Sequence, residues 1–266
     1  MIDINGFERY LYDEELSKNT RSSYMYALRN FAESFEEINK QNIVQWKNML
    51  TETRSPKTVN LRLAALTKYC QYKSVGISIK RMKIQNVISV ENVITSAQYD
   101  LLLQNLKKDN QTNMLIIIKL LAKTGGRISE VIKYRKKDLM KGYVDMKTKG
   151  KIRRIYFPES LVSDIMPVIK GFSENDFLCR NKFGKQITSR GVSENLSRYA
   201  SVYGIPKEVM HPHSFRHFFA VEFLKRNNNI SLLADLLGHS GINTTRIYLR
   251  MSEAQQKAEI DKAVDW

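Results

Sequence analysis

The chain has 266 residues, of which 42% are apolar and 26% are charged, as in an ordinary globular protein of one or two domains. Its net charge of +16 is unusual: residues 1–90 carry 14 Lys and Arg against 9 Asp and Glu, and residues 91–266 carry 29 against 18. Because both parts are positively charged, the sequence favours a polyanion held between two lobes over one bound by a single basic tail. No apolar run approaches a membrane span, and no long basic amphipathic helix stands out, so the pattern does not indicate a membrane partner.

The cysteines and the N-terminus bear on the compartment. Cys70 and Cys179 lie far apart and lack the spacing of metal ligands, which indicates neither a disulfide framework nor a zinc site. The first residues, MIDINGFERYLYDEEL, are acidic where a signal peptide needs a basic and then an apolar run. We therefore expect a cytoplasmic protein.

The first eighty residues predict a small all-helical unit. Phe7, Tyr10 and Leu11 form an apolar stripe, and Thr20 is the expected N-cap of a second helix over RSSYMYALRNFAESF. A third helix is expected over residues 40–52. Ser55-Pro56 then signals a fourth, because a capping serine is followed by proline at the first helical position.

The fourth helix covers KTVNLRLAALTKYCQYK, and helical period is lost between about Lys80 and Glu91. The side chains expected to face the core are Leu61, Leu63, Leu66 and Tyr69, which leaves Lys57, Arg62 and Lys68 for solvent or phosphate. We predict a helical domain over residues 1–85, a linker over 86–91 and a second domain over 92–266.

The second domain begins with two helices and a glycine corner. Thr95 is the expected N-cap of SAQYDLLLQNL, and MLIIIKLLAK, from Asn113, is apolar nearly all round and so predicts a buried helix. Residues 124–126, Thr-Gly-Gly, break it, and ISEVIKY resumes a helix. Arg127 at this corner is either aimed into a cleft or held in an ion pair with Glu130.

From residue 143 the apolar period changes to two. The segments YVDMK, TKG and KIRRIYF predict a hairpin in which Ile155 and Phe157 share a face opposite Arg154 and Tyr156, with Lys149 at the tip. Helices are expected at 159–169 and 189–203. The fold class is therefore mainly α with a small antiparallel β-sheet.

The stretch from His211 to Arg250 contains all four histidines. Ser214 is the expected N-cap of a helix that the asparagines at 227–229 end. His213 at its start and Arg216 one turn later share a face, next to backbone N–H groups that favour an anion. This pair is suited to hold a phosphate or a carboxylate.

A short helix over 230–237, closed by Gly238, precedes His239, and a further helix is expected from Asn243 or Thr244 with Tyr248 about one turn in. Several alternatives are open. The histidines could be ordinary loop residues, and Tyr248 could be ordinary packing. A metal set of His211, His213 and His217 is disfavoured because Pro212 restrains the chain. A helix-turn-helix that presents Arg246 and Arg250 to DNA leaves His213 and Arg216 unexplained.

Four motifs in order carry a family resemblance: T-G-G-R at 124–127, H-S-F-R at 213–216, L-G-H at 237–239 and I-Y at 247–248. They resemble the phage integrase-like, Xer-like tyrosine recombinases, and K-G-K-I-R-R from Lys149 is similar to that family's lysine-bearing turn. The resemblance covers nearly the whole chain, because the N-terminal unit resembles the family's helical core-binding, SAM-like domain. Gly126 and Arg250 depart from the usual pattern, where a larger apolar residue and a histidine are common.

The resemblance implies a catalytic set and no metal or cofactor. Its members would be Arg127, Lys149, His213, Arg216, His239 and Tyr248. Tyr248 would attack the scissile phosphate and form a 3′-phosphotyrosyl link, while the two arginines and His239 stabilise the charge on the phosphate oxygens. Lys149 would protonate the leaving 5′-oxygen, and His213 would assist proton transfer at the tyrosine. Glu130 is expected to brace the site. Lys147 and Lys151 are alternatives for the lysine, and the spacing to Arg154 favours Lys149.

The implied protein is a site-specific DNA recombinase or integrase, built as a two-domain clamp that closes around double-stranded DNA carrying recombination sites. One active site cuts one strand, so exchange between two duplexes implies a homotetramer on synapsed DNA, with a monomer or weak dimer when free. The last segment, SEAQQKAEIDKAVDW, would be a helix that docks on a neighbouring subunit or packs on its own domain. The rivals are a type IB topoisomerase-like relaxing enzyme and a catalytically inactive DNA-binding regulator.

Overall fold

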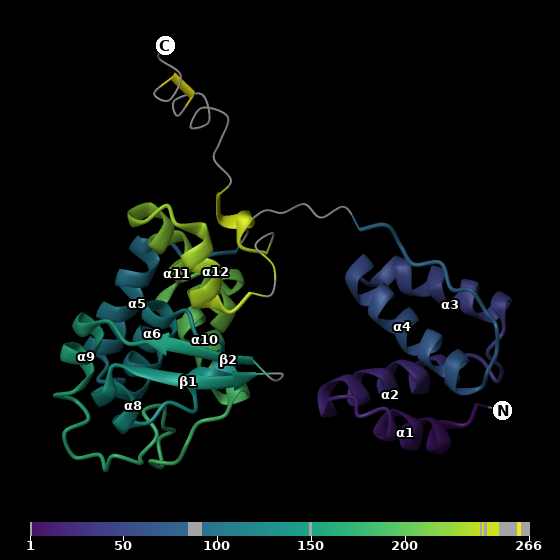
Figure 1. Cartoon of the computed structure of the whole chain (residues 1–266), viewed down its shortest axis with the longest axis horizontal. Coiled ribbons are helices and arrows are strands. Elements are labelled where there is room, and N and C mark those ends of the chain that lie inside the picture. The colour runs from purple at the N-terminus through teal and green to yellow at the C-terminus, as the bar shows by residue number, and fades with distance from the viewer. Residues whose placement is uncertain are drawn as a thin grey trace. The chain divides into compact units, whose positions relative to one another are not determined.

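The computed structural model describes residues 2–84, 92–148, 151–239, 241, 244–249 and 260–261 (Figure 1). The chain divides into two compact units, Met1–Val87 and Ile88–Trp266. The described residues are mainly helical, with one two-stranded antiparallel sheet, so the predicted fold class is confirmed. No helix in this part of the chain is both long enough and apolar enough to cross a membrane.

The N-terminal unit consists of α1 (Ile4–Asp13), α2 (Lys18–Ala32), α3 (Lys40–Thr53) and α4 (Pro56–Tyr72). The apolar faces of these helices meet in one core, which includes Phe7, Leu11, Leu28, Phe31 and Trp46. The third and fourth helices lie where the sequence predicts them, and the start signal of the fourth is confirmed, with Ser55 as N-cap and Pro56 in the first turn.

Two expectations for this unit are wrong. The N-cap of α2 is Ser17, whose Oγ accepts a hydrogen bond from the backbone N–H of Thr20 at 3.2 Å. Both residues can cap a helix, and the earlier one adds helical backbone hydrogen bonds because propagation of a helix is favourable once it has formed. Leu61 is exposed, and Val59 takes its place in the core. Residue 61 lies about 200° around the helix from residue 59, so only 59 shares the buried face with Leu63.

The C-terminal unit is built around α6 (Thr112–Thr124), which packs against α5 (Ser96–Lys108) and α11 (Pro212–Arg226) (Figure 1). Thr95 is the N-cap of α5, as the sequence predicts, and the structure adds a capping box with Gln98. Helix α6 is buried, as expected, and ends at Gly125, whose φ of 60° is a left-handed conformation. A side chain is disfavoured in that conformation, so glycine is the natural residue there.

The helix after the glycine corner is shorter than expected. Only α7 (Ile128–Val131) is helical, and α8 (Lys136–Lys141) follows after a break. The chain leaves the helix because residues 134 and 135 pair with a distant segment: the backbone N–H of Leu178 donates to Tyr134 O at 2.9 Å, and Arg135 forms a bridge with Phe177.

The sheet is the predicted hairpin of β1 (Tyr143–Thr148) and β2 (Lys151–Tyr156), with Tyr143 opposite Tyr156. The predicted alternation is confirmed, since Ile155 and Phe157 are buried while Arg154 and Tyr156 are exposed. The tip with Lys149 lies outside the described residues. Of the two helices that follow, α10 (Ser189–Tyr203) has the expected bounds and α9 (Glu159–Ile165) ends earlier than expected.

The C-terminal elements are η1 (Lys207–Val209), α11, α12 (Ile230–Leu237) and η3 (Arg246–Leu249). Helix α12 and its Gly238 C-cap are as predicted. The N-cap of α11 is His211 and not Ser214, because Pro212 fixes the first helical φ. Ser214 is instead buried, and its Oγ accepts from the backbone N–H of Ile94 at 2.8 Å.

Some expectations fall on residues that are not described. These are the linker over 86–91, most of the final segment, and Asn243, one of the two residues at which the last helix is expected to start. In the described residues 246–249, the turn that carries Tyr248 is a 3₁₀ helix and not an α-helix.

Candidate active site

Arg216 is fixed at the centre of the C-terminal unit by the ends of two helices. Its side chain is buried, with the residue only 3% exposed. Nη1 donates to Gly125 O at 2.8 Å, and Nη2 donates to Leu237 O at 2.6 Å. These carbonyls lie at the C-terminal ends of α6 and α12, where helix carbonyls lack intrahelical partners and carry partial negative charge. Arg216 is therefore held rigidly by backbone carbonyls, which carry only partial charge.

Arg127 lies at the glycine corner beside Arg216. Its backbone N–H donates to Glu130 Oε2 at 2.8 Å, its Nη1 contacts Glu130 Oε1 at 3.3 Å, and its Nη2 donates to Gly238 O at 3.3 Å. The ion pair considered as an alternative role for Arg127 is thus present. The side chain remains 35% exposed, so its guanidinium is still accessible to a ligand.

Arg153, on β2, was not singled out from the sequence, yet it belongs to the same cluster. Its Nη2 contacts Glu130 Oε2 at 2.5 Å, and its Nη1 donates to Leu237 O. Gly238 has a φ of 62°, and a Cβ there would lie 2.4 Å from Arg153 Cδ. The signal that would have found Arg153 is the period of two, which puts it on the buried face with Ile155 and Phe157.

The cluster carries an excess of fixed positive charge. Three guanidinium groups, those of Arg127, Arg153 and Arg216, share one carboxylate, Glu130. Burial and the repulsion of the other two arginines lower the pKa of Arg216 to about 10. Arg216 nevertheless stays protonated at neutral pH, so the cluster favours an anion and above all one with several oxygen acceptors.

His239 follows the Gly238 cap and adjoins the arginines. Its Nδ1 lies 2.8 Å from the hydroxyl of Thr245, which is fully buried. Burial, followed by the charges of Arg216, Arg127 and Arg153, lowers its pKa to about 4. His239 is therefore neutral at neutral pH. A hydroxyl that donates to Nδ1 leaves the ring proton on Nε2.

Tyr248 packs beside α11 and α12, against an apolar cluster that includes Leu224 and Leu233. Its Oη lies 2.5 Å from His217 Nδ1. Burial raises the pKa of Tyr248 to about 12, against a lowering effect of Arg216, so the phenol is protonated at rest. His213 lies one turn before His217, and the two rings stack with centroids 5.8 Å apart.

The structure thus gathers five of the six side chains singled out from the sequence in one region of the C-terminal unit: Arg127, His213, Arg216, His239 and Tyr248. The sixth, Lys149, and the side chain of Lys151 lie outside the described residues, and Lys147 is exposed on β1. His211, weighed earlier as a metal ligand, accepts the Ser214 N–H through Nδ1 and caps α11. His217 was considered only for a metal, so its contact with Tyr248 was missed.

Gly126, where the sequence departs from the common family pattern, has a steric explanation. A Cβ at this position would lie 2.3 Å from the hydroxyl oxygen of Tyr134 and 2.8 Å from Val131 Cγ2. Tyr134 is fully buried against Phe157, with ring centroids 5.1 Å apart. A large aromatic side chain therefore fills the space that a larger residue at 126 would occupy.

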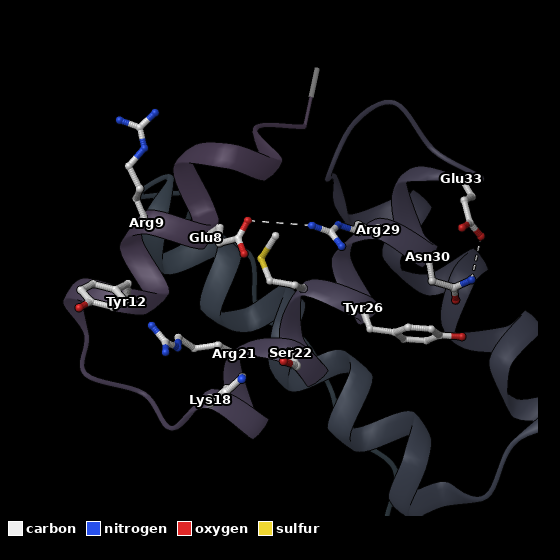
Figure 2. Close-up of a pocket in the computed structure, with 11 residues that line it drawn as sticks. Glu8, Arg9, Tyr12, Lys18, Arg21, Ser22, Tyr26, Arg29, Asn30 and Glu33 are labelled. Atoms are coloured by element: carbon white, nitrogen blue, oxygen red, sulfur yellow. Dashed lines mark hydrogen bonds and ion pairs between the residues drawn. The ribbon is translucent and has the colours of Figure 1, made fainter.

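A separate hollow of about 750 Å³ lies between α1 and α2 of the N-terminal unit (Figure 2). Four cationic side chains line the hollow, and Glu8 and Glu33 are its two acidic residues (Figure 2). The cations are Arg9, Lys18, Arg21 and Arg29. The Arg21 guanidinium lies over the Tyr12 ring, 4.8 Å from its centroid. This hollow has net positive charge and an aromatic face.

Comparison with known proteins gives two family matches. Residues 92–255 match the phage integrase family, and residues 4–74 match the phage integrase N-terminal SAM-like domain. Tyrosine recombinase XerA of Pyrococcus furiosus is 27% identical over 98% of this chain and 93% of its own length. The TnP I resolvase of Bacillus thuringiensis is 25% identical over 96% of this chain and 97% of its own length. A Tn1549 transposon integrase, solved with transposon right end DNA, has a TM-score of 0.76 at 18% identity and covers 99% of both chains.

Proposed function

The chain belongs to the phage integrase family, and we propose that the arginine, histidine and tyrosine side chains gathered in its C-terminal unit are the active site. The protein is a tyrosine recombinase, an enzyme that cuts DNA strands at specific sites and rejoins them. The observation that supports this site best is the excess of three guanidinium groups over one carboxylate beside a half-buried phenol. A phosphodiester at the centre of a displacement needs such a surplus of fixed positive charge.

In the proposed reaction, Tyr248 Oη attacks the scissile phosphorus. The bond between Oη and phosphorus forms as the bond from phosphorus to the 5′-oxygen breaks, leaving a 3′-phosphotyrosyl link and a free 5′-hydroxyl. The ester retains the bond energy. Attack by the 5′-hydroxyl of a partner strand then rejoins the DNA without ATP, and the tyrosine is released.

The phosphate oxygens gain negative charge as the reaction proceeds. Arg127 would meet them first, because its guanidinium is the accessible one, and Arg216 would offer the N–H groups that its two backbone carbonyls leave free. His239 would donate from Nε2, since the Thr245 hydroxyl can occupy Nδ1. Helix-end carbonyls and Glu130 hold these donors in place before the substrate binds, so little reorganisation accompanies the reaction.

Lys149 is proposed as the general acid, because a protonated amine at the tip of the β1–β2 hairpin could deliver a proton to the departing 5′-oxygen. Lys147 and Lys151 remain alternatives. Lys149→Ala should slow cleavage more than Lys147→Ala or Lys151→Ala if the assignment holds. Equal losses at two of these positions would mean that the hairpin has no single acid.

The N-terminal unit is proposed as the second half of a clamp around double-stranded DNA. Its supporting features are the net positive charge of residues 1–90 and the cationic hollow between α1 and α2 (Figure 2). We assign residues 1–85 to this core-binding domain, 86–91 to a linker and 92–266 to the catalytic domain. Because the proposed DNA substrate lies inside the cell, we also propose that the protein is cytoplasmic.

A homotetramer on two synapsed duplexes is proposed for strand exchange, since each site cuts one strand, with a monomer or weak dimer in the absence of DNA. Relatedness to recombinases along nearly the whole chain favours this function over a topoisomerase-like relaxing enzyme and over an inactive regulator. A relaxing enzyme would unwind supercoils without a preferred sequence and without pairing duplexes.

The direct test is the covalent adduct. Nicked duplexes that carry sites selected by binding from a random-sequence library would be incubated with the protein, and denaturing gels would report a DNA-linked species. We expect the adduct with the native protein and none with Tyr248→Phe, which removes the nucleophilic oxygen alone. An adduct with the Phe variant would rule out Tyr248 as the nucleophile, and mapping the attached peptide would identify the residue responsible.

A further inference from the structure

His217 is the group in contact with the reactive oxygen of Tyr248. It lies on α11, one turn beyond His213 and next to Arg216 in the sequence. Its Nδ1 is 2.5 Å from Tyr248 Oη, and the two rings are inclined at 51° with centroids 5.6 Å apart. A phenol oxygen and an imidazole nitrogen at this separation are hydrogen-bonded.

His213 lies in a different relation to the tyrosine. The family resemblance gives His213 the proton transfer at this phenol, but its ring stacks on the ring of His217 at 5.8 Å. Among the described residues, Tyr248 Oη forms its hydrogen bond with His217 and not with His213. The two imidazoles therefore differ in their contacts: the ring of His217 contacts the phenol, and the ring of His213 stacks on that of His217.

We propose that His217 is the catalytic residue that accepts the phenolic proton when Tyr248 attacks the phosphate. This inference rests on the proposed function, because it needs Tyr248 to be the nucleophile. The Oη–H bond breaks and the proton passes to His217 Nδ1, while Oη bonds to phosphorus and the 5′-oxygen leaves with a proton from the general acid. On rejoining, His217 returns its proton to Oη as the ester bond breaks.

The electrostatic surroundings keep His217 ready to accept a proton. Burial, followed by the influence of His213, His211 and Arg216, lowers its pKa to about 4. The ring is therefore neutral at neutral pH, and with its own proton on Nε2 it presents a lone pair at Nδ1. A phosphate anion bound by Arg216 would offset the charge that lowers this pKa, so substrate binding makes His217 a better base at the moment it is needed.

The first test compares variants of His217 in single-turnover cleavage of a nicked duplex. His217→Ala should slow cleavage by about 100-fold or more, the usual effect of losing a general base. His217→Asn keeps a hydrogen-bond acceptor near the phenol but cannot take its proton, so we expect it to be as slow as the alanine variant. Asparagine that restores the native rate would show that His217 only positions the tyrosine, which would overturn the proposal.

Imidazole in the buffer gives a second readout. It should restore part of the cleavage by His217→Ala, because it can occupy the vacated space and accept the proton. His211→Asn is the matched control: His211 caps the same helix, asparagine is a favoured N-cap, and we expect imidazole to leave its cleavage rate unchanged. Cleavage by His217→Ala at the native rate, or a slow rate that imidazole leaves unchanged while DNA binding is intact, would contradict the proposal.

A substrate with sulfur in place of the bridging 5′-oxygen separates this role from that of the general acid. A thiolate leaves without needing a proton, so this substrate should rescue Lys149→Ala and leave His217→Ala slow. Rescue of His217→Ala would assign His217 to the leaving group and overturn the inference. Failure of the proposed function itself would look different, because Tyr248→Phe would then still form the adduct.

Discussion

Each unit contains an ion pair between an arginine and a glutamate, but one pair is exposed and the other is buried. In the N-terminal unit, Arg29 and Glu8 lie 4.0 Å apart with side chains 59% and 60% exposed. In the C-terminal unit, Arg153 and Glu130 lie 2.5 Å apart with side chains 10% and 8% exposed. Water screens the first pair, which contributes about 0–1 kcal/mol, whereas removing one partner of a buried pair costs about 3–5 kcal/mol. The exposed side chains of Arg29 and Glu8 can change conformation, whereas the buried side chains of Arg153 and Glu130 are held in place.

The difference shows what each unit can contribute. Exposed cations on flexible side chains can follow a DNA backbone and attract it, but they cannot be aimed at one phosphorus atom. Cations held by helix-end carbonyls already have a fixed orientation. In a site with little water, each of them stabilises the charge of a transition state far more than an exposed cation does. We therefore expect substitutions in the N-terminal hollow to change binding and substitutions in the C-terminal cluster to change stability and cleavage.

The largest expected effect comes from removing the shared carboxylate. Glu130→Gln leaves three buried or half-buried guanidinium groups without a counter-charge, so we expect a loss of about 3–5 kcal/mol in the free energy of unfolding. Glu8→Gln, its exposed counterpart, should change it by less than about 1 kcal/mol. Urea denaturation of both variants measures the difference. Equal losses would remove the distinction between the two units.

The second prediction concerns cleavage. Arg216→Lys keeps one positive charge but loses the planar fork that reaches Gly125 O and Leu237 O together. We expect single-turnover cleavage to fall by about 100-fold or more while DNA affinity changes little, because the lost contribution is to the transition state. A gel-shift assay on the same preparation supplies the affinity. A fall in affinity as large as the fall in rate would mean that Arg216 acts mainly in binding.

The third prediction is a pH window in which only the C-terminal unit weakens. Burial lowers the pKa of both His217 and His239 to about 4. A histidine with a depressed folded pKa favours folding when it is neutral. Its contribution is complete above the unfolded value of about 6.5 and declines as the pH falls towards 4. The N-terminal unit has no histidine in residues 1–87.

In the N-terminal unit, Lys73 and Tyr72 hold the pKa of Asp3 well below its usual range. The contribution of Asp3 to the free energy of unfolding therefore persists to lower pH. Hydrogen exchange followed by mass spectrometry between pH 7 and 4.5, corrected for intrinsic exchange, should show lost protection in α11 and α12 before α1 and α2. Simultaneous loss in all four helices would contradict the prediction.

The sequence predicted the helices of both units well because their stability depends on local signals. Ser55-Pro56, the Thr95 N-cap and Gly238 each act within one turn, and each prediction is confirmed. The incorrect caps, Thr20 and Ser214, each follow a residue that can also cap a helix, and for α11 the local signal that favours the earlier residue is Pro212. In both cases the residue earlier in the chain is the cap.

The site was partly predictable for a different reason. Motif order singled out the residues that resemble a known reaction, but Arg153 and His217 act through partners 23 and 31 residues away. No local pattern encodes such a contact. The alternation of β2 puts Arg153 on the same face as Ile155, yet only the fold brings it to Glu130 and Leu237.

The fourth prediction tests the packing behind the glycine corner. Gly126→Ala places a Cβ against the Tyr134 hydroxyl and Val131, and we expect a loss of about 1–3 kcal/mol in the free energy of unfolding from overpacking. Tyr134→Phe removes the hydroxyl that the new Cβ would meet first. The double variant should therefore recover part of the loss. A double-mutant cycle with strictly additive effects would show that the two residues do not share this space.

The smallest expected effect lies in the N-terminal hollow. Arg21→Ala removes one cation above the Tyr12 ring, and if that cation meets a phosphate, DNA affinity should fall similarly for all sequences. The slope of log affinity against log salt should also decrease in magnitude by about 1, because one fewer counterion is released. Lys73→Met is the matched control, since Asp3 already pairs with Lys73 at 2.9 Å outside the hollow. An unchanged slope for Arg21→Ala would show that this cation meets no phosphate, and the clamp would then need a different DNA-facing surface on the first unit.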